Sequence, residues 1–199
     1  MVLTVVISLV TGLAFRKKFF GSNLLFYTTV ASLIVPSILV SLGIGLIFNI
    51  MGWEVSWTTS GLGAHLTWTL PFGFLIMIAV FNRFDKSYEE AARDLGASNW
   101  QTIRHVVLPI IGPSLIGVAL FGFTLSYDEF ARTLMTSGVK NTLPLEIFGM
   151  TTNVTTPTLY ALGTLTTFFS LFMILTAMGV LFYLRKRQES HGSDAGKGV

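Results

Sequence analysis

The chain has 199 residues, of which 52% are hydrophobic and only 12% are charged. Soluble domains carry about 25% charged residues, so this composition argues against a soluble globular protein and favours an integral membrane protein. The absence of cysteine excludes disulfides, thiolate metal sites and cysteine catalysis, and in a membrane protein the net charge of +3 indicates cytoplasmic lysine and arginine rather than nucleic-acid binding.

Five apolar runs follow one another along the chain: 1–15, 24–51, 62–81, 110–127 and 159–184. About 20 helical residues cross a hydrocarbon core of about 30 Å, so the last four runs are long enough to span a membrane. The runs predict an all-α polytopic membrane protein. The first run is short, and its charges follow the apolar residues instead of preceding them as in a signal peptide. We expect it to be a partial span, the later part of a helix whose beginning is missing.

Basic residues gather in three segments: after the first run, between the third and fourth runs, and after the fifth. The two other connections contain only Arg132 and Lys140 as cations. If every run spans, the basic segments all lie on one side, which the positive-inside rule makes cytoplasmic. Residues 1–187 are therefore expected to form one transmembrane domain. The polar segment 188–199 is expected to be a disordered cytoplasmic tail.

The polar segment between the third and fourth runs carries strong helix signals. Ser87 is followed three residues later by Glu90, and Ser98 by Gln101, which is the spacing of a capping box. Gly96 lies between them, where a left-handed residue would end the first helix. The pattern predicts a helix, a glycine turn and a second helix, a rigid projection suited to docking in a partner's groove. A solvated amphipathic connector on anionic lipid is the alternative.

The same segment contains a long gapped pattern, in which Val106 occupies the place of an isoleucine. Its other members are Glu90, Ala91, Ala92, Gly96, Leu108 and Pro109. This arrangement resembles the EAA loop of ABC-importer permeases, E-A-A-x3-G-x9-I-x-L-P. The later stretches FTLSYDEFARTLM and NTLPLEIF resemble the spermidine/putrescine branch of that family. The resemblance implies a type I ABC-importer transmembrane domain with about five of the usual six spans, and it makes residues 83–108 the coupling loop.

The resemblance further implies a permease subunit that is not an enzyme and binds no cofactor of its own. It would form half of a translocation path in a bacterial inner membrane, beside a second permease subunit that the branch suggests is a different chain. ATP and Mg would be bound by separate ATP-binding ABC subunits, and a periplasmic or surface-tethered binding protein would select the solute. The branch implies a polyamine; ferric ion, an opine-like amine or, in another class, ion-coupled secondary transport are the alternatives.

Roles for loop residues also follow from the resemblance. Residues from Ala97 to about Thr102 would form the coupling helix, Glu90 would pair with a basic residue of the ATPase, and Gly96 would permit a turn that a side chain obstructs. Trp100 is either an interface anchor or a membrane-surface aromatic. The residues expected to contact the ATPase are Glu90, Ala91, Ala92, Gly96, Ala97, Ser98, Trp100, Leu108 and Pro109.

A second candidate site lies at the outer end of the fourth run. Asp128 and Glu129 stand between Tyr127 and Phe130, and carboxylates beside aromatic rings suit a di- or polycation. An ion pair of Arg132 with these carboxylates is the alternative, because the spacing matches neighbours on a helix. No group of His, Asp and Glu has the spacing of a metal site.

Overall fold

The computed structural model describes residues 1–153 and 157–195. Over these residues the fold is entirely helical, as predicted. The elements in chain order are α1 Val2–Ala14, α2 Ser22–Ala31, α3 Ser37–Ile50, η1 Trp57–Gly61, α4 Leu62–Arg83, α5 Ser87–Asp94, α6 Asn99–Thr102, η2 Ile103–Val107, α7 Leu108–Tyr127, α8 Leu143–Asn153 and α9 Pro157–Ala195. The two η segments are π-helical turns that lead directly into the long helices α4 and α7.

Three continuous helices are long and apolar enough to cross a membrane: Trp57–Arg83, Asn99–Tyr127 and Pro157–Tyr183. They contain the predicted spans 62–81, 110–127 and almost all of 159–184. The prediction of one span over 24–51 is wrong, because the chain breaks there into α2 and α3 around Pro36, which has φ −56° and ψ 130°. Proline has no N–H to donate and disfavours the helical region at the preceding residue, which favours a break here, although α4 and α7 continue past Pro71 and Pro113.

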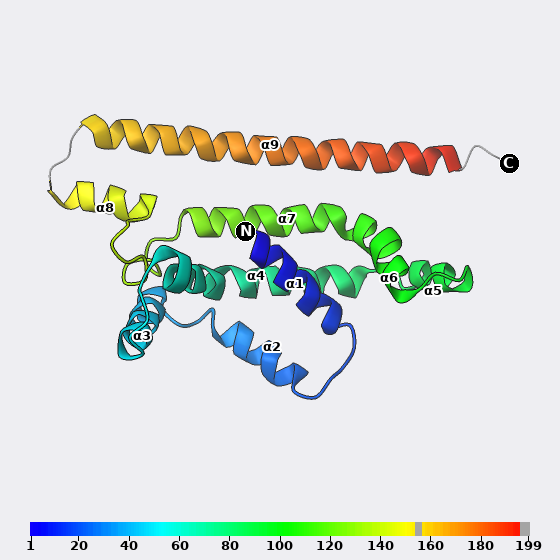
Figure 1. Ribbon diagram of the computed structural model, residues 1–199. Coiled ribbons are helices and arrows are strands. Elements are labelled where there is room, and N and C mark those ends of the chain that lie inside the picture. The colour runs from blue at the N-terminus through cyan, green and yellow to red at the C-terminus, as the bar shows by residue number, and fades with distance from the viewer. Residues whose placement is uncertain (154–156, 196–199) are drawn as a thin grey trace.

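The bundle is centred on α4 and α7, which run side by side with α1 crossing them (Figure 1). The apolar core consists of Met77, Phe81, Val107, Ile111 and Val118. At one end of α4 and α7 lie α5 and α6, and at the opposite end lie α3 and α8. The two candidate sites are therefore at opposite ends of the bundle.

Helix α1 packs on α4 through small side chains. Thr4, Ser8 and Gly12, spaced four residues apart, are the buried residues of α1. They face Gly73 and Met77 of α4, and Thr4 also shares a 2.9 Å hydroxyl–hydroxyl hydrogen bond with Thr69. Small residues let helix backbones approach closely, which is how helices pack within a membrane, where lipid supplies no hydrophobic drive for association.

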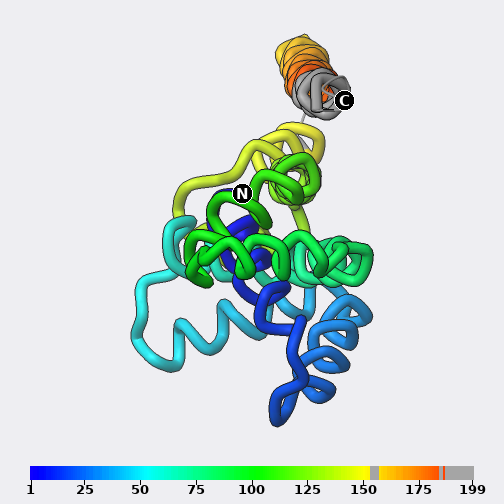
Figure 2. The backbone as a smooth tube through the Cα atoms, turned by 90° about the vertical axis from the view of Figure 1, so that its right-hand side faces the viewer, coloured from blue at the N-terminus to red at the C-terminus, as the bar shows by residue number. Residues whose placement is uncertain are grey.

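Much of the apolar surface of the spans faces outward. In α9 none of the membrane-spanning stretch is buried inside the protein. The buried share is 22% in the span that contains α7 and 39% in the span that contains α4. Figure 2 shows α9 standing apart from the bundle on one side, with α2 on the other. An apolar helix without protein cover suits a lipid environment or contact with a further membrane protein.

The structure differs from the sequence expectation at the C-terminal end. Helix α9 continues to Ala195, so the expected disorder is wrong over residues 188–195. Gln188 and Glu189 are good helix formers, and each residue added to an existing helix gains a backbone hydrogen bond. Residues 196–199 lie outside the described part of the chain.

Candidate functional site

Helix α5 does not begin at the capping box predicted for Ser87 and Glu90. Its N-cap residue is Lys86, whose side chain makes no capping hydrogen bond. The Ser87 N–H instead donates to Asp85 Oδ1 over 2.9 Å. This backbone hydrogen bond, followed by one from the Ser87 side chain, lowers the pKa of Asp85. The prediction failed because the Asp85 carboxylate takes the Ser87 N–H that the Glu90 side chain would have accepted, and the Glu90 N–H donates to the Lys86 carbonyl (3.1 Å) instead of to the Ser87 hydroxyl.

The glycine turn after α5 is as predicted. Gly96 has a φ of +85°, its N–H donates to the Arg93 carbonyl (2.8 Å), and the Ala97 N–H donates to the Ala92 carbonyl (3.0 Å). These two bonds form a Schellman motif, which satisfies the last carbonyls of the helix. A Cβ at Gly96 would meet no atom within 4 Å. The need for glycine inside this chain is therefore the left-handed backbone rather than lack of space.

The second capping box is present. The Gln101 N–H donates to Ser98 Oγ (3.3 Å), and the Ser98 N–H donates to Gln101 Oε1 (2.8 Å). Helix α6 then continues through η2 into α7, with Pro109 in the first turn of α7. Pro109 therefore lies inside a continuous helix, and the π-helical turn η2 directly before it is the kind of local adjustment that accommodates a proline without ending the helix. Residues Asn99–Tyr127 thus form one unbroken helix of 29 residues from the coupling loop to the opposite end of the bundle.

The coupling loop exposes apolar side chains as well as charge. Leu95 is 90% exposed and Trp100 is 65% exposed. A shallow cavity of about 330 Å³ adjoins Leu95 and is lined by Leu95, Gly96, Ala97, Gln101, His105 and Val106. Glu90 and Ala91 are exposed beside it, and Ala92 is half-buried. Leu95 was not among the residues predicted to contact the ATPase, although a leucine directly before a turn glycine in a polar loop is a detectable signal.

Glu89, which the sequence analysis also missed, is the buried carboxylate of the coupling loop. It is 6% exposed, whereas the neighbouring Glu90 is exposed. It forms ion pairs with Arg16 (2.5 Å) and with Arg93 (3.2 Å). The pair with Arg93 could be found from its spacing of four residues. The pair with Arg16 depends on the tertiary fold.

At the other end of the bundle, the residues of the second candidate site, Tyr127, Asp128, Glu129 and Phe130, do not converge on one point. Tyr127 stacks on Phe123 and makes a tilted ring contact with Phe169 of α9, at centroid distances of 5.6 and 5.7 Å. Phe130 contacts Phe148 of α8 at 4.8 Å. Asp128 is exposed, while Glu129 is buried.

The predicted alternative, an ion pair of Arg132 with Asp128 or Glu129, is wrong. The two ion pairs among the described residues both involve Glu89. Glu129 Oε1 accepts instead from the backbone N–H of Arg132 (2.8 Å). Helix α7 ends at Tyr127, so the side-chain spacing of a helix does not apply beyond it.

The Arg132 side chain is directed toward α3 and α4. Its guanidinium donates to Thr67 Oγ1 (2.7 Å) and Ser37 Oγ (3.3 Å) and lies 4.7 Å from the ring centre of Trp68. Burial lowers the pKa of Arg132, and the nearby Glu129 charge opposes that shift. Arg132 is 1% exposed, and its hydrogen bonds connect the segment between α7 and α8 to the helices α3 and α4.

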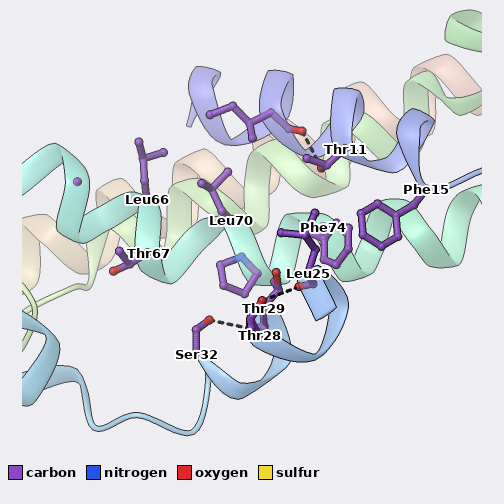
Figure 3. A pocket seen from close by; sticks show the side chains of 13 residues that line it. Thr11, Phe15, Leu25, Thr28, Thr29, Ser32, Leu66, Thr67, Leu70 and Phe74 are labelled. Atoms are coloured by element: carbon purple, nitrogen blue, oxygen red, sulfur yellow. Dashed lines mark hydrogen bonds between the residues drawn. The ribbon is translucent and has the colours of Figure 1, made fainter. Parts of the chain in front are cut away.

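Two cavities between the helices were not predicted from the sequence. One of about 410 Å³ is lined by apolar side chains and by hydroxyls of Thr4, Thr69, Ser126 and Thr133, with His65 bonded to Ser126 over 3.0 Å. Another of about 450 Å³ lies between α1, α2 and α4 (Figure 3). The hydroxyls of Thr11, Thr28 and Ser32 donate to backbone carbonyls three or four residues earlier in the chain. The interior of this cavity is therefore mostly apolar. Among the described residues no group of His, Cys, Asp and Glu could hold a metal.

Known proteins resemble this chain over most of its length. The family described as "Binding-protein-dependent transport system inner membrane component" matches residues 4–190. The chain is 33% identical to the spermidine/putrescine transport system permease protein PotC of Haemophilus influenzae, over 89% of this chain and 65% of that protein. It is 30% identical to the putrescine transport system permease protein PotI of Escherichia coli, over 86% of this chain and 62% of that protein. The chain therefore spans less than two thirds of the length of these relatives.

A solved structure has the same fold. A chain of the inward-facing MetNI methionine ABC transporter matches with a TM-score of 0.67 at 19% identity, over 91% of this chain and 87% of that one. At this identity the match concerns the fold alone. Together with the family match over residues 4–190, it confirms the resemblance seen in the coupling loop. The chain is a member of the family of binding-protein-dependent transport system inner membrane components.

Proposed function

We propose that this chain is a permease subunit of an ATP-driven importer, forming half of a translocation path and coupling it to a separate ATPase. The observation that carries the proposal is the coupling loop. Its two helices are joined by a Schellman turn at Gly96 and a capping box at Ser98, and it exposes Leu95 and Trp100 at one end of the bundle. A connector needs no such rigidity, whereas a helix that docks in a partner's groove does.

The coupling helix continues directly into a span, and this continuity supports a lever mechanism. At 1.5 Å per residue, the 29 residues of Asn99–Tyr127 trace about 43 Å of helix, so a push on α6 passes through the turn η2 into α7 without an intervening loop. Closure of the ATPase subunits around ATP and Mg would shift α6 and rock α7 between two states. This chain supplies the lever, and the partner chains supply ATP hydrolysis.

The proposed solute is a polyamine such as putrescine or spermidine, as the names of the relatives suggest. Asp128 is exposed at the outer end of α7, where a carboxylate can attract a cation. One oxygen of Glu129 is already occupied by the Arg132 N–H. We therefore assign the first electrostatic contact to Asp128, with Tyr127 and Phe130 as neighbouring aromatic rings.

The remaining partners follow from the same proposal. The uncovered apolar surface of α9 is available to lipid and to a second permease subunit, which we propose is a different chain. A periplasmic or surface-tethered binding protein would deliver the solute at the end that carries Asp128. The coupling loop and the C-terminus would be cytoplasmic.

The coupling proposal is tested in liposomes containing the assembly purified through a tag on this chain. We expect uptake that requires ATP, and ATP hydrolysis that the binding protein stimulates. Glu90→Gln and Gly96→Val should abolish the stimulation while leaving membrane insertion intact. Gly117→Ala is the matched control, since Gly117 lies inside α7 with no atom within 4 Å of an added Cβ. Unchanged coupling in both loop variants would reject the proposal.

The solute is tested separately, by calorimetric titration of the cognate binding protein with putrescine and spermidine. Sulfate is the informative comparison, because the chain is also 38% identical over 116 residues to a probable sulfate permease of Chlorella vulgaris. Binding of a polyamine supports the assignment. A binding protein that ignores both polyamines contradicts the solute while leaving the coupling proposal standing.

A further inference from the structure

Three elements of the permease meet at the side chain of Arg16. Arg16 follows the C-terminal end of α1, and its guanidinium forms the ion pair with Glu89 of α5. The same guanidinium lies 5.3 Å from the ring centre of Phe81 in α4 and 5.5 Å from that of Phe84 just beyond it. One cation therefore links α1, the cytoplasmic end of α4 and the coupling loop.

This link is buried, unlike most ion pairs near a protein surface. The side chains of Arg16 and Glu89 are 16% and 7% exposed, respectively. Arg93, the other partner of Glu89, is 53% exposed and belongs to the same helix as Glu89. An exposed pair within one helix contributes little, whereas a desolvated pair between elements is costly to break because one charge is left without a partner.

Helix α5 packs against α6 and η2, and the Arg16–Glu89 ion pair connects it to α1. In turn α1 is closely fitted to α4, because a Cβ at Gly12 would lie 2.8 Å from Met77 Cβ. A displacement of the coupling loop can therefore reach the bundle by two routes. One is the continuous helix α6–α7, and the other is the ion pair from α5 to α1.

We propose that the Arg16–Glu89 ion pair is a positioning contact that stays closed during transport and makes α1 move with the coupling loop. This inference rests on the proposed function. Glu89 does not touch solute or ATPase in this account; it acts through α1. Without the pair, α6 would still move α7, but α1 would no longer follow, and ATP hydrolysis would proceed with less solute moved.

The test measures solute taken up per ATP hydrolysed in the reconstituted assembly. Glu89→Gln should lower this ratio about fivefold or more, the lower end of typical coupling between sites. Arg93→Gln is the matched control: it removes the exposed pair within α5 but keeps the pair between elements, and its ratio should equal that of the wild type. A wild-type assembly without ATP-dependent uptake would reject the proposed function. A coupled wild type with an equally coupled Glu89→Gln variant would reject this inference alone.

A second arm separates positioning from simple folding. This chain contains no cysteine, so Arg16→Cys and Glu89→Cys can be introduced together and joined by a short, reducible bis-methanethiosulfonate linker. The unlinked double variant should be uncoupled, the linked form should regain the wild-type ratio, and reduction should abolish it again. A linked, fully assembled transporter that stays uncoupled would overturn the proposal, as would one that is coupled before linking.

Discussion

The packing of α1 on α4 can be tested at Gly73, in the middle of α4. A Cβ there would overlap Ser8 Oγ and would lie 3.1 Å from Ser8 Cβ and 3.3 Å from Thr4 Cγ2. Overpacking of this kind costs about 1–3 kcal/mol, and alanine regains about 0.8–1.0 kcal/mol of helix propensity over glycine. Gly73→Ala should therefore lower the free energy of unfolding by about 0–2 kcal/mol.

Ser8 provides a second change that relieves the first. Ser8 Oγ is buried without a hydrogen-bond partner in the described part of the chain, so Ser8→Ala alone should be neutral or stabilising. In the Ser8→Ala background the overlapping atom is absent, and the cost of Gly73→Ala should fall. We expect an interaction free energy of about 1 kcal/mol in the double-mutant cycle, within the range for residues in contact.

The assay is equilibrium unfolding of the purified chain in mixed detergent and SDS micelles, followed by tryptophan fluorescence. Gly117→Ala makes the same chemical change where an added Cβ meets no atom within 4 Å, and it should stabilise by up to about 1 kcal/mol. If Gly73→Ala is as stabilising as Gly117→Ala, and Ser8→Ala has no influence on it, α1 does not pack on α4 in the way described.

Three further predictions concern the loops. Ser98→Ala should cost about 1 kcal/mol of local stability and should speed hydrogen exchange at Gln101, while unchanged exchange would argue against the cap. Arg132→Lys should cost about 1.5–3 kcal/mol in the SDS assay, because a single ammonium cannot hold Thr67 and Ser37 together as two nitrogens of the guanidinium do; wild-type stability would show that these contacts are unimportant. The bond from Ser87 keeps the folded pKa of Asp85 below its ordinary 3.8, so its contribution is present above pH 3.8 and is lost as the pH falls through the folded value. Exchange in the first turn of α5 should rise on that acidification in the wild type but not in Asp85→Asn, and equal acid sensitivity of the two would contradict the capping.

The sequence predicted the features that depend on local pattern. The spans within α4, α7 and α9 follow from length and apolarity, and Gly96 and Ser98 lie in motifs whose hydrogen bonds form within five residues. The break at Pro36 was visible in the sequence, but its apolar neighbours suggested a single span. At Pro36 the backbone geometry of a single residue separates two helices, although the whole segment 24–51 is apolar.

The features that were missed depend on contacts between distant segments or on where a helix ends. Arg132 has the spacing of a helical ion pair with Asp128, yet α7 stops at Tyr127 and the guanidinium turns to Thr67, 65 residues earlier. Glu89 and Glu90 look equivalent in sequence. In the fold Glu89 is the one that is buried, in an ion pair with Arg16, which follows α1. Such outcomes require the tertiary fold.

The central claim is that the coupling loop projects on the cytoplasmic side and receives the ATPase. A single cysteine at Asn99, the first residue of α6, tests it with a membrane-impermeant maleimide in right-side-out and inside-out vesicles. We predict labelling only in inside-out vesicles, and protection from the label when the ATPase subunits are bound. Labelling from the outer face, or equal labelling with and without the ATPase, would contradict the account.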